Sequence, residues 1–315
     1  MPHRSVIVAG LQAAGIFVAG ILNIPIISQI IILFVPVPLV AVSLLRGRKA
    51  GAAAGGIAAA LVALVSGGQI AVLLLFLSLL VMALGLAEGM TRGLRPEQAI
   101  ILGGVLPLIP LMLFLAPLLA KAGKNPILLA EEYLRQNLAD AQQLYVRMGL
   151  AEVAQSVAAV ADAVVFYLVR LMPGLLLATS LLQAATCYGM ARVIILRRSP
   201  ASPLAASPSL AVWHAPDSWV WGLIVALGSI AVFPRGSAAW FAGLNLAILY
   251  LLVYLTQGIA IVEYFQRKAR VPAIWRSFLH ALILALPTVV AVLAFGIVDI
   301  WGDFRKIRAA APGSS

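Results

Sequence analysis

The feature that most constrains this chain is a series of long apolar runs almost free of charge. Residues 281–298, for example, contain no charged side chain. A helix of about 20 apolar residues crosses a hydrocarbon layer of ~30 Å. Lipid offers no partners for unpaired backbone groups, and the alternating pattern of a β-barrel is absent, so the runs are expected to be helices. With 63% hydrophobic residues, the sequence predicts an all-α fold, a polytopic transmembrane helical bundle whose main surroundings are the lipid bilayer.

The apolar runs predict eight or nine membrane spans. The candidates are Val6–Leu22, Ile26–Leu45, Gly51–Val65, Ile70–Leu86, Ala99–Leu119, Val164–Leu196, Trp219–Phe233, Ala238–Val262 and Trp275–Val298. The third run is short and rich in glycine and alanine, which predicts close packing against a neighbouring helix. Internal prolines in the second and fifth runs are expected to kink or interrupt those helices.

Positive charges indicate how the chain is oriented. They gather in every second connection, at Arg4, at Arg46, Arg48 and Lys49, at Arg92 and Arg95, at Arg197 and Arg198, and at Arg267, Lys268, Arg270 and Arg276. Bases accumulate on the cytoplasmic side of membrane proteins. We therefore expect a multi-pass protein of the cell (inner) membrane with a cytoplasmic N-terminus. The net charge of +11 reflects these short clusters and does not indicate a nucleic-acid partner.

Two stretches are expected to lie outside the membrane and divide the chain. Residues 125–162 are acidic and have apolar side chains at helical spacing with a break at Gly149, which predicts an extracytoplasmic amphipathic helical hairpin. Residues 197–217 are rich in serine and proline and predict a cytoplasmic linker. The expected domains are a six-span bundle over residues 1–196, with the hairpin inserted in it, and a unit of two or three spans over residues 218–315.

The chain lacks the sequence patterns of common enzymes. Its three histidines are far apart, its one cysteine has no partner, and neither a phosphate-binding glycine loop nor Gly-x-Ser-x-Gly occurs. We therefore expect no catalytic residues, no bound metal and no cofactor.

Three polar residues of the run 238–268 fall on one helix face. Asn245, Thr256 and Glu263 are separated by 11 and 7 residues, which at 100° per residue places them within about 20° of one another. Polar groups in a span need a partner or water. The stripe is expected either to pack against other spans or to line a ligand path.

Two further groups are candidates for contacts. Ala9 and Ala13 are one turn apart in the first span, where small residues allow another helix to approach closely. At the other end, Asp299 and Asp303 are also one turn apart, with Trp301 between them and Arg305 just after. This C-terminal motif is either a charged and aromatic exit from the membrane or a contact with a partner or ligand.

The stretches "WHAPDSWVWGL", "LYLLVYLTQGIAIVEYFQRK" and "GIVDIWGDFRK" resemble the YybS-like family of bacterial multi-pass membrane proteins. The resemblance implies that the first six spans are related to the substrate-binding S-components of energy-coupling-factor transporters. It also implies that Ala9 and Ala13 occupy the position at which S-components dock onto their coupling subunit. The acidic hairpin and the spans after the linker depart from ordinary S-components.

Two functional hypotheses follow. The first is a non-enzymatic membrane subunit that binds a small solute of unknown identity or serves a transporter, with a membrane protein partner at the first span. The alternative is a structural or regulatory membrane scaffold without a ligand.

Overall fold

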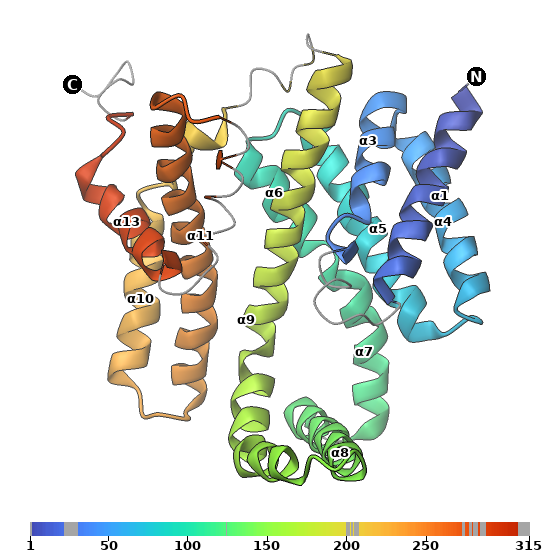
Figure 1. The fold of residues 1–315 in the computed structure, drawn as a ribbon, viewed down its shortest axis with the longest axis vertical. Coiled ribbons are helices and arrows are strands. Elements are labelled where there is room, and N and C mark those ends of the chain that lie inside the picture. The colour runs from blue at the N-terminus through green and yellow to red at the C-terminus, as the bar shows by residue number, and fades with distance from the viewer. Residues whose placement is uncertain are drawn as a thin grey trace. The chain divides into compact units, whose positions relative to one another are not determined.

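A computed structural model describes residues 2–21, 31–123, 125–199, 202, 204, 208–272, 275–276, 279, 283 and 288–307. Over these residues all regular elements are helices, which confirms the predicted all-α class (Figure 1). The chain divides into two compact units, Met1–Val169 with Thr179–Ser207, and Arg170–Ala178 with Pro208–Ser315.

The first unit is built from the helices of about the first two thirds of the chain. They are α1 (Pro2–Ile21), α3 (Pro36–Arg46), α4 (Arg48–Val65), α5 (Ile70–Thr91), α6 (Pro96–Val105), α7 (Leu108–Ala122), α8 (Pro126–Arg147) and most of α9 (Ala151–Arg198). The second unit holds residues 170–178 of α9, the short 3-10 helix η2 (Leu210–Val212), α10 (Trp219–Val232), α11 (Ala238–Lys268) and α13 (Thr288–Gly302).

Six stretches of helix are long and apolar enough to cross a membrane, counted over the described residues only. They lie in α1, α4, α5, α6 with α7, α9 and α11. The shorter apolar helices α3, α10 and α13 overlap the remaining three predicted runs, although α3 ends one residue and α13 four residues beyond them. The predicted span from Ile26 and the one from Trp275 each begin in segments that lie partly outside the described residues.

Two of the predicted helix breaks occur at prolines, whereas Pro117 lies inside the continuous helix α7. Helix α3 begins at Pro36, and Pro107 separates α6 from α7. Proline suits the first turn of a helix, because its missing N–H would be unpaired there. It also cannot donate the hydrogen bond that would continue a helix.

The glycine-rich helix α4 packs closely, as its composition predicted. A Cβ atom placed on Gly55 would meet the side chain of Leu80 in α5, and one on Gly51 would meet Ser43 in α3. These contacts border the core of the first unit, where Phe17 and Phe76 pack edge to face with ring centroids 5.3 Å apart.

The predicted hairpin is formed by α8 and the start of α9. The side chain of Asn125 caps α8 by accepting a hydrogen bond from the Ile127 N–H at 2.9 Å. Gly149 supplies the turn with φ of 77°, a conformation that glycine adopts at little cost, and an ion pair between Arg135 and Asp162 joins the two arms. The second arm is not a separate helix, because α9 continues without a break from Ala151 to Arg198.

Helix α11 is the centre of the second unit and packs against both α10 and α13. Figure 1 shows α13 crossing α11 rather than running alongside it. The crossing is close because two glycines meet there: a Cβ atom on Gly258 would meet the carbonyl of Val292, and one on Gly296 would meet that of Tyr254. Tyr254 is therefore buried on this face of α11.

Candidate functional site

The C-terminal motif forms a buried ion pair. Asp299, near the end of α13, accepts a hydrogen bond at 2.9 Å from the guanidinium of Arg305, and both side chains are almost completely buried. The same guanidinium donates to the backbone carbonyls of Ala211 at 3.0 Å and Trp213 at 2.8 Å. Arg305 thereby ties α13 to the segment that precedes α10.

The other members of the motif have different surroundings. Asp303 follows the end of α13 with φ of 36°, and its carboxylate accepts from the Ile307 N–H at 3.0 Å. Trp301 is exposed. Asp299 and Asp303 thus do not act as a pair, because the chain turns between Gly302 and Arg305 and brings the arginine to the first carboxylate.

The sequence reasoning overlooked Gln257, which completes this network. Its side chain is 0% exposed, donates to Asp299 at 3.2 Å and accepts from the Ala215 N–H at 3.0 Å. One sequence signal could have identified it. Gln257 is a polar residue in an apolar run, directly before Gly258, and glycine in such a run often marks the close approach of another helix. The three-residue network of Asp299, Arg305 and Gln257 is called the C-terminal clamp below.

Asn245 contacts α9 at the turn that contains Pro173. Its side-chain carbonyl accepts from the Gly174 N–H at 2.6 Å, and its amide donates to the Arg170 carbonyl at 2.8 Å. In a regular helix those two backbone groups would bond to each other. Pro173 lies inside the helix at this turn. Helices bend where a proline interrupts their backbone hydrogen bonds or where a side chain inserts between the bonded groups. The side-chain amide of Asn245 therefore provides hydrogen-bond partners for two backbone groups of α9.

The other two residues of the predicted stripe do not join Asn245 in one site. The hydroxyl of Thr256 donates to the Leu252 carbonyl of its own helix at 2.9 Å. Glu263 is buried and pairs with Arg267 at 2.5 Å and with Arg276 at 3.3 Å. The stripe consists of three separate local contacts, although all three residues do find hydrogen-bond partners.

Asn245→Leu is expected to destabilise the protein by about 1–3 kcal/mol, because it leaves the Gly174 N–H and the Arg170 carbonyl without their side-chain partner. The midpoint of thermal unfolding in mild detergent measures the loss. Thr256→Val is the matched control, since its hydroxyl bonds only within its own helix turn, and it should shift the midpoint little. Equal shifts for the two variants would show that Asn245 does not support α9.

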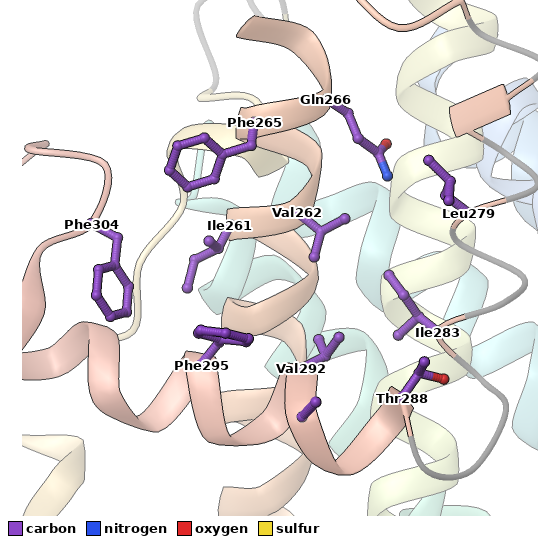
Figure 2. Close-up of a pocket in the computed structure, with 11 residues that line it drawn as sticks. Ile261, Val262, Phe265, Gln266, Leu279, Ile283, Thr288, Val292, Phe295 and Phe304 are labelled. Atoms are coloured by element: carbon purple, nitrogen blue, oxygen red, sulfur yellow. The ribbon is translucent and has the colours of Figure 1, made fainter. Parts of the chain in front are cut away.

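A pocket of about 660 Å³ lies in the second unit between α11, α13 and residues 279 and 283 (Figure 2). Its inner wall consists of buried apolar side chains, among them Ile261, Ile283 and Val292. Three exposed phenylalanines also line it, Phe265, Phe295 and Phe304. The pocket volume lies in the range of about 300–1,000 Å³ that is common for small-molecule sites.

One polar side chain in this pocket has no partner. Gln266 is only 6% exposed, and neither its amide nitrogen nor its carbonyl oxygen forms a hydrogen bond within the described part of the chain. Figure 2 shows this side chain extending from α11 toward Leu279. A buried polar group without a hydrogen bond costs about 1–3 kcal/mol, so Gln266 is the residue of this pocket that most needs an explanation.

The model of a family described as "Predicted membrane protein (DUF2232)" matches residues 13–300. The chain belongs to this family. The match covers most of both units, the clamp residues Gln257 and Asp299 but not Arg305, and every described residue of the pocket except Phe304. No curated protein and no solved structure is found to match the chain.

In this DUF2232 family member, Ala9 and Ala13 are covered by the chain itself. Both side chains are buried in the core of the first unit, and the adjacent Gly10 approaches Ala54 and Ile57 of α4. Docking of a partner at these alanines stays a prediction, and in this structure the close helix contact is with α4. Among the described residues, no group of three or more histidine, cysteine, aspartate or glutamate side chains is arranged to hold a metal ion.

Proposed function

We propose that this multi-pass membrane protein is a non-enzymatic subunit that binds a small solute in the pocket between α11 and α13. The observation that carries the proposal is the buried, unpartnered amide of Gln266 in a pocket whose other described lining residues are apolar except for Thr288. A ligand that hydrogen-bonds this amide would remove the cost of leaving it unpaired. Apolar pockets with a few well-placed polar groups are the usual form of small-molecule sites.

The resemblance to the YybS-like family supports a role in association with a transporter, because it relates the first six spans to substrate-binding S-components. The proposed ligand site differs from that expectation in its place, since it lies in the second unit and not in the six-span bundle. The second unit would then be the ligand-responsive part of the subunit, and the first unit would be the part that contacts a membrane protein partner.

The alternative function is a membrane scaffold without a ligand, and the C-terminal clamp favours it. Most polar atoms of the clamp are satisfied inside the chain. Such a network rigidifies the structure around it. The two proposals differ in whether the purified protein carries a small molecule.

Ala291→Trp is expected to abolish retention of a copurifying small molecule. Ala291 lines the pocket and is exposed, so a larger side chain can fill the pocket from its rim without being forced into the core. Native mass spectrometry of the protein purified in mild detergent measures the bound mass. Val290→Trp is the control. Val290 directly precedes Ala291 in α13 and is exposed, but it is not among the residues that line the pocket.

Three outcomes separate the proposals. A bound molecule present in the wild type and in Val290→Trp but lost from Ala291→Trp supports solute binding. A wild-type protein that carries no small molecule in any preparation, and that binds none when candidate ligands are added, supports the scaffold. Chemical conversion of the bound molecule during incubation would contradict the non-enzymatic part of the proposal.

We also propose that the N-terminus faces the cytoplasm and that the membrane is the cell (inner) membrane, because the basic clusters alternate in that sense. Ser202→Cys should then be protected from an impermeant thiol reagent in intact cells and react after the cells are opened. Cys187 is buried and is replaced by alanine to remove background. Labelling of Ser202→Cys in intact cells would reverse the orientation.

A further inference from the structure

The lining of the pocket excludes a charged ligand group. None of the eleven described residues that line it is charged: they are Ile261, Val262, Phe265, Gln266, Leu279, Ile283, Thr288, Ala291, Val292, Phe295 and Phe304. Several ionic groups that are close in sequence to the pocket residues have partners of their own. Arg267 and Arg276 both pair with Glu263, and Arg305 pairs with Asp299. A charged group in the pocket would lose its hydration without gaining an ionic partner, which is costly.

The amide of Gln266 specifies the kind of polar group that fits. A carboxamide offers two donors on its nitrogen and an acceptor on its oxygen. All of these are unpaired within the described part of the chain. The best complement is an uncharged group that both donates and accepts, such as a hydroxyl.

The position of Gln266 along α11 gives the ligand a direction. It is the last buried residue of the helix and directly precedes the exposed bases Arg267 and Lys268. Basic residues at the end of an apolar helix mark the edge of the hydrocarbon layer. The rest of the pocket extends from there toward Val292 and Thr288 of α13 (Figure 2), so a polar head at Gln266 would place an apolar body deeper in the membrane.

The rim of the pocket is apolar as well. Phe265 is 44%, Phe295 55% and Phe304 41% exposed, and the rings of the last two pack edge to face at 6.3 Å. Phe265 lies on α11, which is long and apolar enough to cross a membrane, and an exposed aromatic side chain on such a helix is expected to face hydrocarbon. A ligand can therefore enter from the bilayer, without passing through water.

We infer that the pocket takes an uncharged single-chain amphiphile from the bilayer, with a hydroxyl or similar neutral head on Gln266 and its hydrocarbon chain along α13. This inference rests on the proposed function and names its ligand class. The polar head matches the amide of Gln266, and the hydrocarbon chain matches the apolar side chains of the pocket. A helix surface that contacts bulk lipid non-specifically would offer only the apolar part.

Three probes with the same C18 cis-9 hydrocarbon chain test the inference: oleyl alcohol, oleyl sulfate and cis-9-octadecene (octadecene below). Each is radiolabelled and equilibrated with the full-length protein in detergent micelles. Oleyl alcohol should bind about tenfold more tightly than octadecene, the size expected for one hydrogen bond that satisfies a buried amide. Oleyl sulfate should bind at least tenfold more weakly than the alcohol, because its charge has no partner in the pocket.

Gln266→Leu should remove the preference for the alcohol over octadecene, because leucine has a similar size but no polar atoms. The variant should fold, since it replaces an unpaired buried amide by an apolar side chain, and its ligand-free thermal midpoint should equal or exceed that of the wild type. Gln143→Leu, in α8 outside this pocket, is the control and should keep the preference.

The inference is overturned if oleyl sulfate binds as tightly as the alcohol, if Gln266→Leu keeps the preference, or if none of the probes binds the wild type. These results leave the proposed function standing so long as Ala291→Trp still loses a copurified molecule. Conversely, a protein that retains no copurified molecule but binds oleyl alcohol through Gln266 would support the ligand class and show that the site is empty after purification.

Discussion

Arg305→Met is expected to lower the midpoint of thermal unfolding in mild detergent by on the order of 10 °C. Removing one partner of a buried ion pair leaves the other charge buried and unpaired, which costs about 3–5 kcal/mol, and 1 kcal/mol corresponds to roughly 2–4 °C for a protein of this size class. The substitution also takes the hydrogen-bond donor away from the carbonyls of Ala211 and Trp213. Methionine keeps an unbranched apolar stem like that of arginine, so the loss reports mainly the guanidinium with its charge and hydrogen bonds.

Two further variants test the mechanism of this effect. Lys306→Met removes the neighbouring base, which is exposed, and should leave the midpoint nearly unchanged. Combining Arg305→Met with Asp299→Leu removes both buried charges and should recover part of the loss, because the uncompensated carboxylate is gone. If Arg305→Met behaved like Lys306→Met, the C-terminal clamp would contribute nothing to stability and the scaffold alternative would lose its support.

Gly296→Ala is expected to destabilise the second unit by about 3 kcal/mol. The added methyl group would meet backbone atoms of α11, including the carbonyl of Tyr254 and the nitrogen of Gly258 at 2.8 Å. Neither is the end of a flexible side chain that could turn aside. The two helices must therefore separate, which disturbs the crossing that also holds Asp299 beside Gln257.

The matched control is Gly228→Ala in α10. A Cβ atom at Gly228 has nothing within 4 Å, so alanine should be neutral or stabilise the helix by up to about 1 kcal/mol. Opposite signs for two identical substitutions would place the effect of Gly296→Ala in the helix crossing. A neutral Gly296→Ala would contradict the close approach of α11 and α13.

Local sequence determined the helices and where they break. Hydrophobicity along the chain identifies the apolar helices, because transfer into lipid depends on each segment's own composition. Proline and glycine act on the backbone of their own turn, so the start of α3 at Pro36, the break at Pro107 and the turn at Gly149 could be predicted. The close packing of α4 likewise followed from its small side chains.

The partners of the buried polar groups were decided by the tertiary structure. Asn245 was recognised as a polar residue in a span, but nothing near it in the sequence points to Gly174 and Arg170, about seventy residues away. Spacing alone also grouped Asn245 with Thr256 and Glu263, because a helix wheel shows a shared direction and not what lies opposite each turn.

The same limit applies to the C-terminal motif and to the pocket. The sequence placed Asp299 and Arg305 close together, but their burial depends on the carbonyls of Ala211 and Trp213. Gln257 and Gln266 have the same chemistry and lie nine residues apart on α11, yet one is satisfied and the other is not. The polar atoms of a side chain, and thus its need for a hydrogen-bond partner, can be read from the sequence. Which group becomes that partner depends on how helices distant in the sequence pack together.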